Sequence, residues 1–262
     1  MEKHGSSFDA VLEDAQNLGY AEADPSFDID GVDAAHKLAI LAALSFGTAV
    51  DFEGVEIAGI RSIMAADIGQ AKALGYRIRL LGMARIDGGK LFQRVNLYLV
   101  PENHPLAHIE GSTNAVVAEG NFSGRLMFQG AGAGDGPTAS AIVADLIDIA
   151  RGDSGTVFAM PIAEMKKSER AESGNRTGKS YIRFIVADKP GVLAEITAAM
   201  RDAQVSIESL IQTEKTDEGS VLISMVTHQS LERDVIQSLE KLSNLSSLQG
   251  APVVMHLLSD ED

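Results

Sequence analysis

The sequence predicts an α+β protein of two modules: a first module of residues 1–163 and a second module of residues 181–262, joined by a connecting segment of residues 164–180. Three observations lead to this fold class. Hydrophobic residues of the first module follow a helical period and then a strand period. The second module alternates strands and helices in a regular order. The connecting segment is charged, rich in Ser and Gly, and nearly free of large apolar residues.

Three helices are predicted in the first part of the first module. In residues 7–18, apolar side chains recur at the spacing of one helix face, and Gly19 follows as a C-terminal stop. Residues 32–46 and 63–74 show the same kind of pattern, and Gly75 ends the second of these two helices. Helices therefore dominate the chain up to this glycine.

Strands follow, because the hydrophobic period then changes. The tetrapeptide Asp-Gly-Gly-Lys at residues 87–90 is a hairpin signal between two β-rich runs, and a helix rich in Ala and Ile closes the module at residues 138–150. Helices packed on a largely antiparallel sheet make the first module a mixed α/β unit of the α+β class. The predicted strands are residues 76–86, 91–100, 115–118 and 125–128.

The second module has a cleaner pattern of strands and helices. Its order is β-α-β-β-α-β, which is the ferredoxin-like arrangement. The polar composition of the connecting segment predicts a mobile linker between the two modules. The predicted strands are residues 181–186, 206–212, 221–227 and 253–258, and the predicted helices are residues 192–203 and 231–242.

Charge and composition narrow the classes of function that the sequence allows. The formal net charge of −15 repels nucleic acids and anionic membranes, and no apolar run reaches the ~18 residues needed to cross a bilayer. The chain has no Cys, which excludes disulfides and thiolate metal sites, and its six His residues show no metal-site pattern. The first residues do not resemble a signal peptide, so a cytoplasmic enzyme without a metal is the expectation.

Acidic residues gather in a Pro-broken loop that leads into the helix predicted at residues 32–46. From residue 38 onward, that helix carries Ser45 as its only polar residue. A helix that is apolar all round is expected to be buried. The acidic residues are Glu22, Asp24, Asp28, Asp30 and Asp33.

Asp33 and Lys37 lie four residues apart and therefore on one face of this helix, which continues through Ile40, Leu41 and Leu44. A lysine at the mouth of a buried helix, with a carboxylate one turn before it, can serve as a general acid or base near neutral pH. The same spacing also suits an ordinary helix ion pair, which contributes ~0.2–0.5 kcal/mol. The spacing alone leaves both interpretations open.

A glycine-rich stretch, Gly-Ala-Gly-Ala-Gly-Asp-Gly-Pro-Thr, occupies residues 130–138 and runs into the predicted closing helix with Pro137 in the favoured first position. Backbone N–H groups at such a helix start can face an anion, and glycines allow a ligand to approach closely. A flexible turn that leads into a helix and binds no ligand would show the same pattern of glycines. A ligand site and a simple turn therefore both stay open.

Two segments closely resemble the signature of the homoserine dehydrogenases. They are Gly-Tyr-Ala-Glu-Ala-Asp-Pro at residues 19–25 and Asp-Gly-Val-Asp-Ala-Ala-His-Lys-Leu-Ala-Ile-Leu at residues 30–41. The resemblance implies an NAD(P)-dependent oxidoreductase. Such an enzyme interconverts L-homoserine and L-aspartate 4-semialdehyde in the biosynthesis of threonine, methionine and isoleucine.

The resemblance also implies roles for individual residues. Glu22 and Asp33 would hold the substrate, Lys37 would be the catalytic proton donor and acceptor, and Gly19 would lie beside the cofactor, NAD or NADP. The chemistry agrees, because carboxylates suit the ammonium group of homoserine and reduction of the semialdehyde needs a proton at the developing alkoxide. Asp28 is a further candidate for substrate binding.

Two further motifs resemble parts of this family. Gly132 and Gly134 of the glycine-rich stretch match a loop that packs against the cofactor, and the hexapeptide Asp-Lys-Pro-Gly-Val-Leu at residues 188–193 resembles the opening of ACT domains. That turn often helps to bind an amino acid at a domain interface, and threonine is the effector that the family suggests. A module that only pairs subunits is the alternative. The implied effector residues are Asp188, Gly191, Val192 and Leu193.

The resemblance implies a homodimer or a higher homo-oligomer as well. The family dimerises through the region that corresponds to residues 76–128 of this chain. Within it, Ile78, Leu80, Leu97 and Leu99 alternate along two strands and are candidates for an apolar face that one chain leaves uncovered.

The family begins with a dinucleotide-binding domain that carries Gly-x-Gly-x-x-Gly after its first strand. No such unit precedes Gly19, so the resemblance covers only the C-terminal portion of the family, and we expect the chain to be a fragment that is inactive alone. An alternative of another class stays open. It is a non-catalytic protein for amino-acid sensing or subunit pairing, built from a relic catalytic domain and an ACT module.

Overall fold

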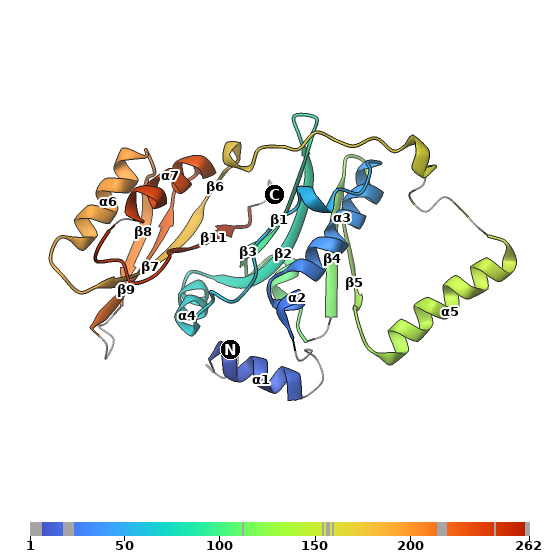
Figure 1. Ribbon diagram of the computed structural model, residues 1–262, viewed down its shortest axis with the longest axis horizontal. Helices are drawn as coiled ribbons and strands as arrows, with labels where there is room; N and C mark the ends of the chain where they lie inside the picture. The colour runs from blue at the N-terminus through green and yellow to red at the C-terminus, as the bar shows by residue number, and fades with distance from the viewer. Residues whose placement is uncertain are drawn as a thin grey trace.

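The computed structural model confirms an α+β fold (Figure 1). The second module lies at one end of the molecule, and helix α5 (Asp135–Arg151) projects from the first module at the other end. Among the described residues, no helix is long and apolar enough to cross a membrane. The structure describes residues 7–17, 24–111, 113–153, 155, 158, 160–213, 219–243 and 245–259.

The helices and strands predicted for the first module are all present, with shifts of a few residues at their ends. Short elements that were not predicted include helix α2 (Ser26–Ile29), strand β1 (Glu56–Ile57) and two 3-10 helices (Phe52–Gly54 and Pro105–His108). The other elements of this module are α1 (Phe8–Asn17), α3 (Val32–Phe46), α4 (Ala65–Ala73), β2 (Tyr76–Asp87), β3 (Lys90–Pro101), β4 (Thr113–Gly120) and β5 (Gly124–Ala131).

β2 and β3 form a long antiparallel hairpin whose turn consists of Gly88 and Gly89. Both glycines have positive φ angles, +57° and +82°, which a tight two-residue hairpin turn requires. Strand β3 is buried along nearly its whole length, because one face packs against α3 and α4. Its other face contacts residues 105–108 and the connecting segment. The hairpin is therefore the centre of the first module.

The second module has the predicted ferredoxin-like order. Its strands lie in the sheet as β11-β7-β9-β8, and its helices pack together over that sheet. Ile182, Phe184, Ile196 and Met200 are fully buried between sheet and helices. The elements are β7 (Ser180–Ala187), α6 (Val192–Asp202), β8 (Ile207–Gln212), β9 (Ser220–Thr227), α7 (Glu232–Leu242) and β11 (Val253–Leu257).

The two modules share one seven-stranded sheet. β11 of the second module pairs in parallel with β3 of the first, with His256 opposite Tyr98 and Leu257 opposite Leu99. A hydrophobic cluster follows the same junction, where Leu99 packs with Tyr181 and other side chains of both modules. Hydrogen bonds and apolar packing therefore both join the modules.

The connecting segment is not the mobile linker that its composition predicts. Leu91 donates its backbone N–H to Glu169 at 2.7 Å and accepts one from Ala171 at 2.9 Å. Arg170 forms an ion pair with Asp51 at 2.7 Å. Farther along, β6 (Thr177–Gly178) pairs with β10 (Ser230–Leu231). Polar side chains and backbone groups hold this segment in place, and composition alone does not reveal such partners.

Helix α3 is also less buried than its sequence predicts. One face, which includes Leu38 and Ala39, packs against Val95 and Val55. The opposite face is open: Ile40 is 52% exposed and Leu44 is 49% exposed. The prediction of burial on every side is wrong, because no described element of this chain covers that second face.

The residues predicted to form an uncovered apolar face are covered or partly covered within the chain itself. Leu97 and Leu99 are 2% and 0% exposed, because α4 and the second module cover them within the chain. Uncovered apolar side chains lie instead on β4 and β5, where Val116 stands opposite Phe128. These two strands form a separate two-stranded sheet.

Candidate active site

The predicted acid–lysine pair forms at the start of α3. Lys37 Nζ lies 2.6 Å from Asp33 Oδ2, one helical turn away, and the two side chains are 60% and 38% exposed. Gly31 is the N-cap of this helix, and its φ of +82° is unfavourable for most residues other than glycine. A Cβ at this position would also lie only 3.2 Å from Val95 Cγ1. The backbone therefore fixes where the pair stands, and both side chains remain open to a ligand.

The acidic loop (residues 24–31) before α3 is held by Arg61. Its Nη2 donates to Asp30 Oδ2 at 2.9 Å and to Ser26 Oγ at 2.9 Å. The hydrogen bonds from Arg61 hold the pKa of Asp30 below its ordinary value. Asp24 accepts hydrogen bonds from Ser26, which likewise lower its pKa. These two carboxylates are committed to the shape of the loop.

Asp28 differs from its acidic neighbours. It lies in α2, and its residue is exposed, so its carboxylate stands toward solvent near the start of α3. Glu22 and Gly19, the other predicted residues of this motif, lie outside the described residues. Within the described part of the motif, the structure therefore brings Asp33 and Lys37 into direct contact and leaves Asp28 accessible.

Aromatic rings flank the acid–lysine pair, and the sequence analysis did not identify them. His36 stacks on Phe52 with ring centroids 4.0 Å apart and on Phe27 at 5.7 Å. Phe27 belongs to α2, so the stack ties this short helix to α3. Phe52 is distant in sequence, and the pattern around His36 gave no signal for either contact.

The glycine-rich stretch forms the entry to α5. The helix begins at Asp135, so Pro137 is its third residue and not the first, as predicted. A Cβ at Gly132 would collide with the side chain of Asn114. Gly134 has a φ of +111° and no side-chain cap. These glycines lie beside the β4–β5 sheet, which shares no strand pairing with the sheet that carries α3.

The predicted effector turn lies between β7 and α6. Gly191 has a φ of +96° and precedes the first turn of α6. Asp188 donates its backbone N–H to Gly219 at 3.4 Å, which links this turn to the start of β9. Val192 is 6% exposed because its side chain is part of the core, whereas Leu193 is 37% exposed. The side chain of Val192 is therefore not available to a ligand, whereas that of Leu193 is accessible.

The fold and the site together define a mixed α/β module with an acid–lysine pair, joined to a ferredoxin-like module. Residues 1–147 match the family model described as homoserine dehydrogenase, and residues 180–244 match the model described as ACT domain. The chain belongs to the homoserine dehydrogenase family.

The related proteins are longer than this chain. A homoserine dehydrogenase of Neisseria gonorrhoeae is 40% identical over 261 residues, which cover 97% of this chain and 60% of that protein. One from Synechocystis is 41% identical over 269 residues and covers 99% of this chain and 62% of its own length. The crystal structure of a homoserine dehydrogenase from Thiobacillus denitrificans has a TM-score of 0.86 at 38% identity, and covers 99% of this chain and 60% of that one. The chain thus spans about 60% of the curated relatives it matches.

Proposed function

We propose that this chain provides the substrate-holding and proton-transferring part of a homoserine dehydrogenase. The reaction interconverts L-homoserine and L-aspartate 4-semialdehyde with NAD or NADP, in the biosynthesis of threonine, methionine and isoleucine. The observation that carries the proposal is the accessible Lys37–Asp33 pair at 2.6 Å, directly after a loop with a fixed backbone. Membership of the homoserine dehydrogenase family supports the same conclusion.

The proposed roles follow from the chemistry of the substrate. Homoserine carries an ammonium group, and the carboxylates of Asp33, Asp28 and Glu22 are suitable partners for it. Asp33 also orients Lys37 Nζ through their direct contact. When the semialdehyde is reduced, Lys37 donates a proton to the carbonyl oxygen as that oxygen becomes an alkoxide. In the opposite direction, the amine accepts the hydroxyl proton of homoserine.

The cofactor would supply or accept the hydride when bound. Gly134 suits the approach of such a group, because its backbone conformation excludes most side chains and nothing lies near its Cβ position except Pro137 Cδ at 3.7 Å. Gly132 fits less well, because the side chain of Asn114 occupies the space that its missing Cβ leaves. Gly134 is therefore the better candidate for close approach of the cofactor, and Gly19 is the third residue proposed to lie beside it.

We expect the 262-residue chain alone not to oxidise homoserine with either cofactor, and the chain joined to a dinucleotide-binding domain to do so. In the joined enzyme, Lys37→Ala should lower kcat by about 10²–10⁴-fold, which is the usual contribution of general acid–base catalysis. Lys72→Ala, an exposed lysine on α4, is the matched control and should leave kcat unchanged. Steady-state kinetics decide the matter. A loss below about tenfold on Lys37→Ala would mean that the proton moves by another route.

We further propose that threonine is an effector that binds at the turn of residues 188–193, between two paired second modules. Support comes from the match to an ACT domain and from the open backbone around Gly191.

Threonine at a hundredfold excess over its dissociation constant should stabilise the chain by about 2.7 kcal/mol. A thermal shift of the whole chain measures this effect. Gly191→Val should abolish the shift, and Gly250→Val, at another positive-φ glycine, should not. If threonine, methionine, isoleucine and lysine all leave the melting temperature unchanged, the second module serves only to pair subunits.

A further inference from the structure

The bridging segment (residues 56–67) lies between the second module and the acidic loop. It begins with β1, crosses beside the loop and ends in the first turn of α4. Side chains of the second module hold one end directly and the other end through an arginine of β3, and the middle of the segment holds the acidic loop. Each of these three attachments rests on its own contacts.

The end of the bridging segment is bound by β7 of the second module. Asp67 is fully buried, and its Oδ1 accepts a hydrogen bond from the Tyr181 hydroxyl at 2.9 Å. Arg183 Nε lies 2.9 Å from the same oxygen, and Arg183 Nη2 donates to the carbonyl oxygen of Ser62 at 2.7 Å. Oδ2 of Asp67 accepts the backbone N–H of Met64 at 2.8 Å. Two side chains of β7 therefore fix the segment where α4 begins.

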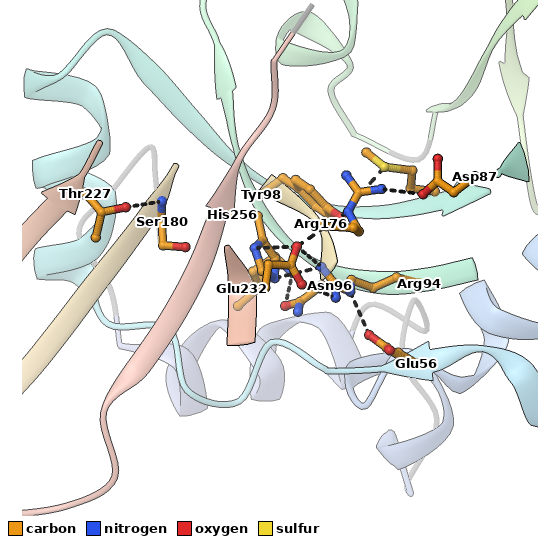
Figure 2. A network of polar contacts seen from close by, with 12 residues as sticks. Glu56, Asp87, Arg94, Asn96, Tyr98, Arg176, Ser180, Thr227, Glu232 and His256 are labelled. Carbon is orange, nitrogen blue, oxygen red and sulfur yellow. Dashed lines mark hydrogen bonds and ion pairs between the residues drawn. The ribbon is translucent and has the colours of Figure 1, made fainter. Parts of the chain in front are cut away.

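The beginning of the bridging segment is bound through an arginine of β3. Figure 2 shows Arg94 between Glu56 and Glu232, the first residue of α7. Arg94 Nε lies 2.9 Å from Glu56 Oε2, and its Nη1 and Nη2 lie 2.9 Å and 2.6 Å from the two oxygens of Glu232. The Arg94 and Glu232 side chains are 5% and 11% exposed. Removing the charge of Glu232 is strongly destabilising, because Arg94 loses its buried acidic partner and keeps the half-exposed Glu56.

The middle of the bridging segment is bound to the acidic loop. Ile60 donates its backbone N–H to the carbonyl oxygen of Ile29 at 2.8 Å, and Arg61 pairs with Asp30 at 2.9 Å. At Gly59 there is no room for a Cβ, because it would collide with the backbone of Ile29 and Asp30. Loop and segment are therefore in direct backbone contact.

We propose that Arg183 and Glu232 of the second module are positioning residues for the acid–lysine site and act through the bridging segment. The acidic loop leads at once into Gly31 and α3, so a shift of the segment displaces Asp33 and Lys37. The second module thereby sets the geometry in which the substrate is held. The role in turnover rests on the proposed function, whereas the mechanical link does not.

The link is tested by hydrogen exchange in the 262-residue chain, read by mass spectrometry. Glu232→Gln should speed exchange severalfold in peptides covering residues 24–37, whereas Glu240→Gln, the same change on the solvent side of α7, should not. Arg61→Gln, at an exposed side chain, should speed exchange in the same peptides. Combined with it, Glu232→Gln should add little, because the contact that carries the effect is already lost. Unchanged exchange, or fully additive effects, would overturn the link. If Glu232→Gln does not fold, Arg183→Lys, which keeps the charge, takes its place.

The positioning role is tested by kinetics in the chain joined to a dinucleotide-binding domain. Glu232→Gln should raise the KM for homoserine severalfold with a smaller change in kcat, and Glu240→Gln should leave both constants unchanged. An altered hydrogen exchange with an unaltered KM would overturn the positioning role. If Lys37→Ala retains activity, the proposed function fails, and the hydrogen-exchange result still decides the link by itself.

Discussion

Asp51 is the carboxylate that anchors the connecting segment. Its side chain is 6% exposed and lies 2.7 Å from Arg170 and 3.7 Å from Lys167, both of which belong to that segment. Hydrogen bonds from Arg170 hold the pKa of Asp51 below its ordinary value, while burial opposes the shift. The ionised form of Asp51 is therefore the form that the fold favours.

Asp51→Asn should remove part of the acid sensitivity of the chain. Because the pKa of Asp51 is lower in the folded than in the unfolded chain, its ionised form contributes stability above about pH 4, and this contribution is lost as the pH falls through the folded value. Urea midpoints should be higher for the unchanged chain than for Asp51→Asn near neutral pH, and the difference should shrink in acid. Asp145→Asn, on exposed α5, is the control. A difference that does not depend on pH would contradict this role.

Besides the open face of α3, uncovered apolar side chains of the first module lie on α5 and on the β4–β5 hairpin. On the hairpin, Val116, Leu126 and Phe128 share one face and are 38%, 44% and 61% exposed. Contiguous apolar surface of this kind marks an interaction site in soluble proteins. We propose that a second copy of the chain covers this hairpin face.

We expect the chain to be a dimer at micromolar concentration through this hairpin face. Replacing both Leu126 and Phe128 by Glu should yield monomers, because paired copies would bury the new charges without partners. Phe122→Glu changes an equally apolar residue at the hairpin tip, outside the shared face, and should leave the dimer intact. Sedimentation equilibrium measures all three proteins. A dimer that survives the double replacement would assign pairing to the second module.

Elements with a clear hydrophobic period could be predicted from the sequence, and contacts between distant segments could not. The i,i+4 spacing was enough to place Asp33 beside Lys37, because the contact lies within one helix. The Arg61–Asp30 bridge joins residues 31 positions apart, and no local pattern encodes it. The prediction of a mobile linker was wrong for a related reason. The polar composition of the connecting segment predicts exposure to solvent, but backbone groups of the segment form hydrogen bonds with Leu91. Whether a face of a helix or strand is buried likewise depends on elements that lie far away in the sequence.

The whole molecule is organised around the sheet that both modules share. A core that crosses the junction has the consequence that neither module can unfold without exposing apolar surface of the other. Met255, at 0% exposure in β11, is part of this shared core, whereas Met200, also at 0%, lies in the core of the second module alone.

We therefore expect one cooperative unfolding transition for the chain. Calorimetry should give equal calorimetric and van't Hoff enthalpies. Met255→Ala should cost about 2–5 kcal/mol and shift that single transition to lower temperature without splitting it. Met200→Ala is the comparison and should behave in the same way. Two transitions, of which Met200→Ala moves only one, would show that the modules unfold independently.

The junction at β11 also limits how copies of the chain can assemble. A ferredoxin-like sheet has two edge strands with unpaired backbone groups, and a protein that exposes both edges can polymerise without limit. Here β3 of the same chain pairs with the end of β11, at His256 and Leu257, and β8 is the outer strand at the other edge of the second module. When two β8 strands pair about a twofold axis, the remaining edge of each second module is the β11 edge, where β3 blocks the approach of another copy. Edge-to-edge growth through the second module therefore terminates at two copies.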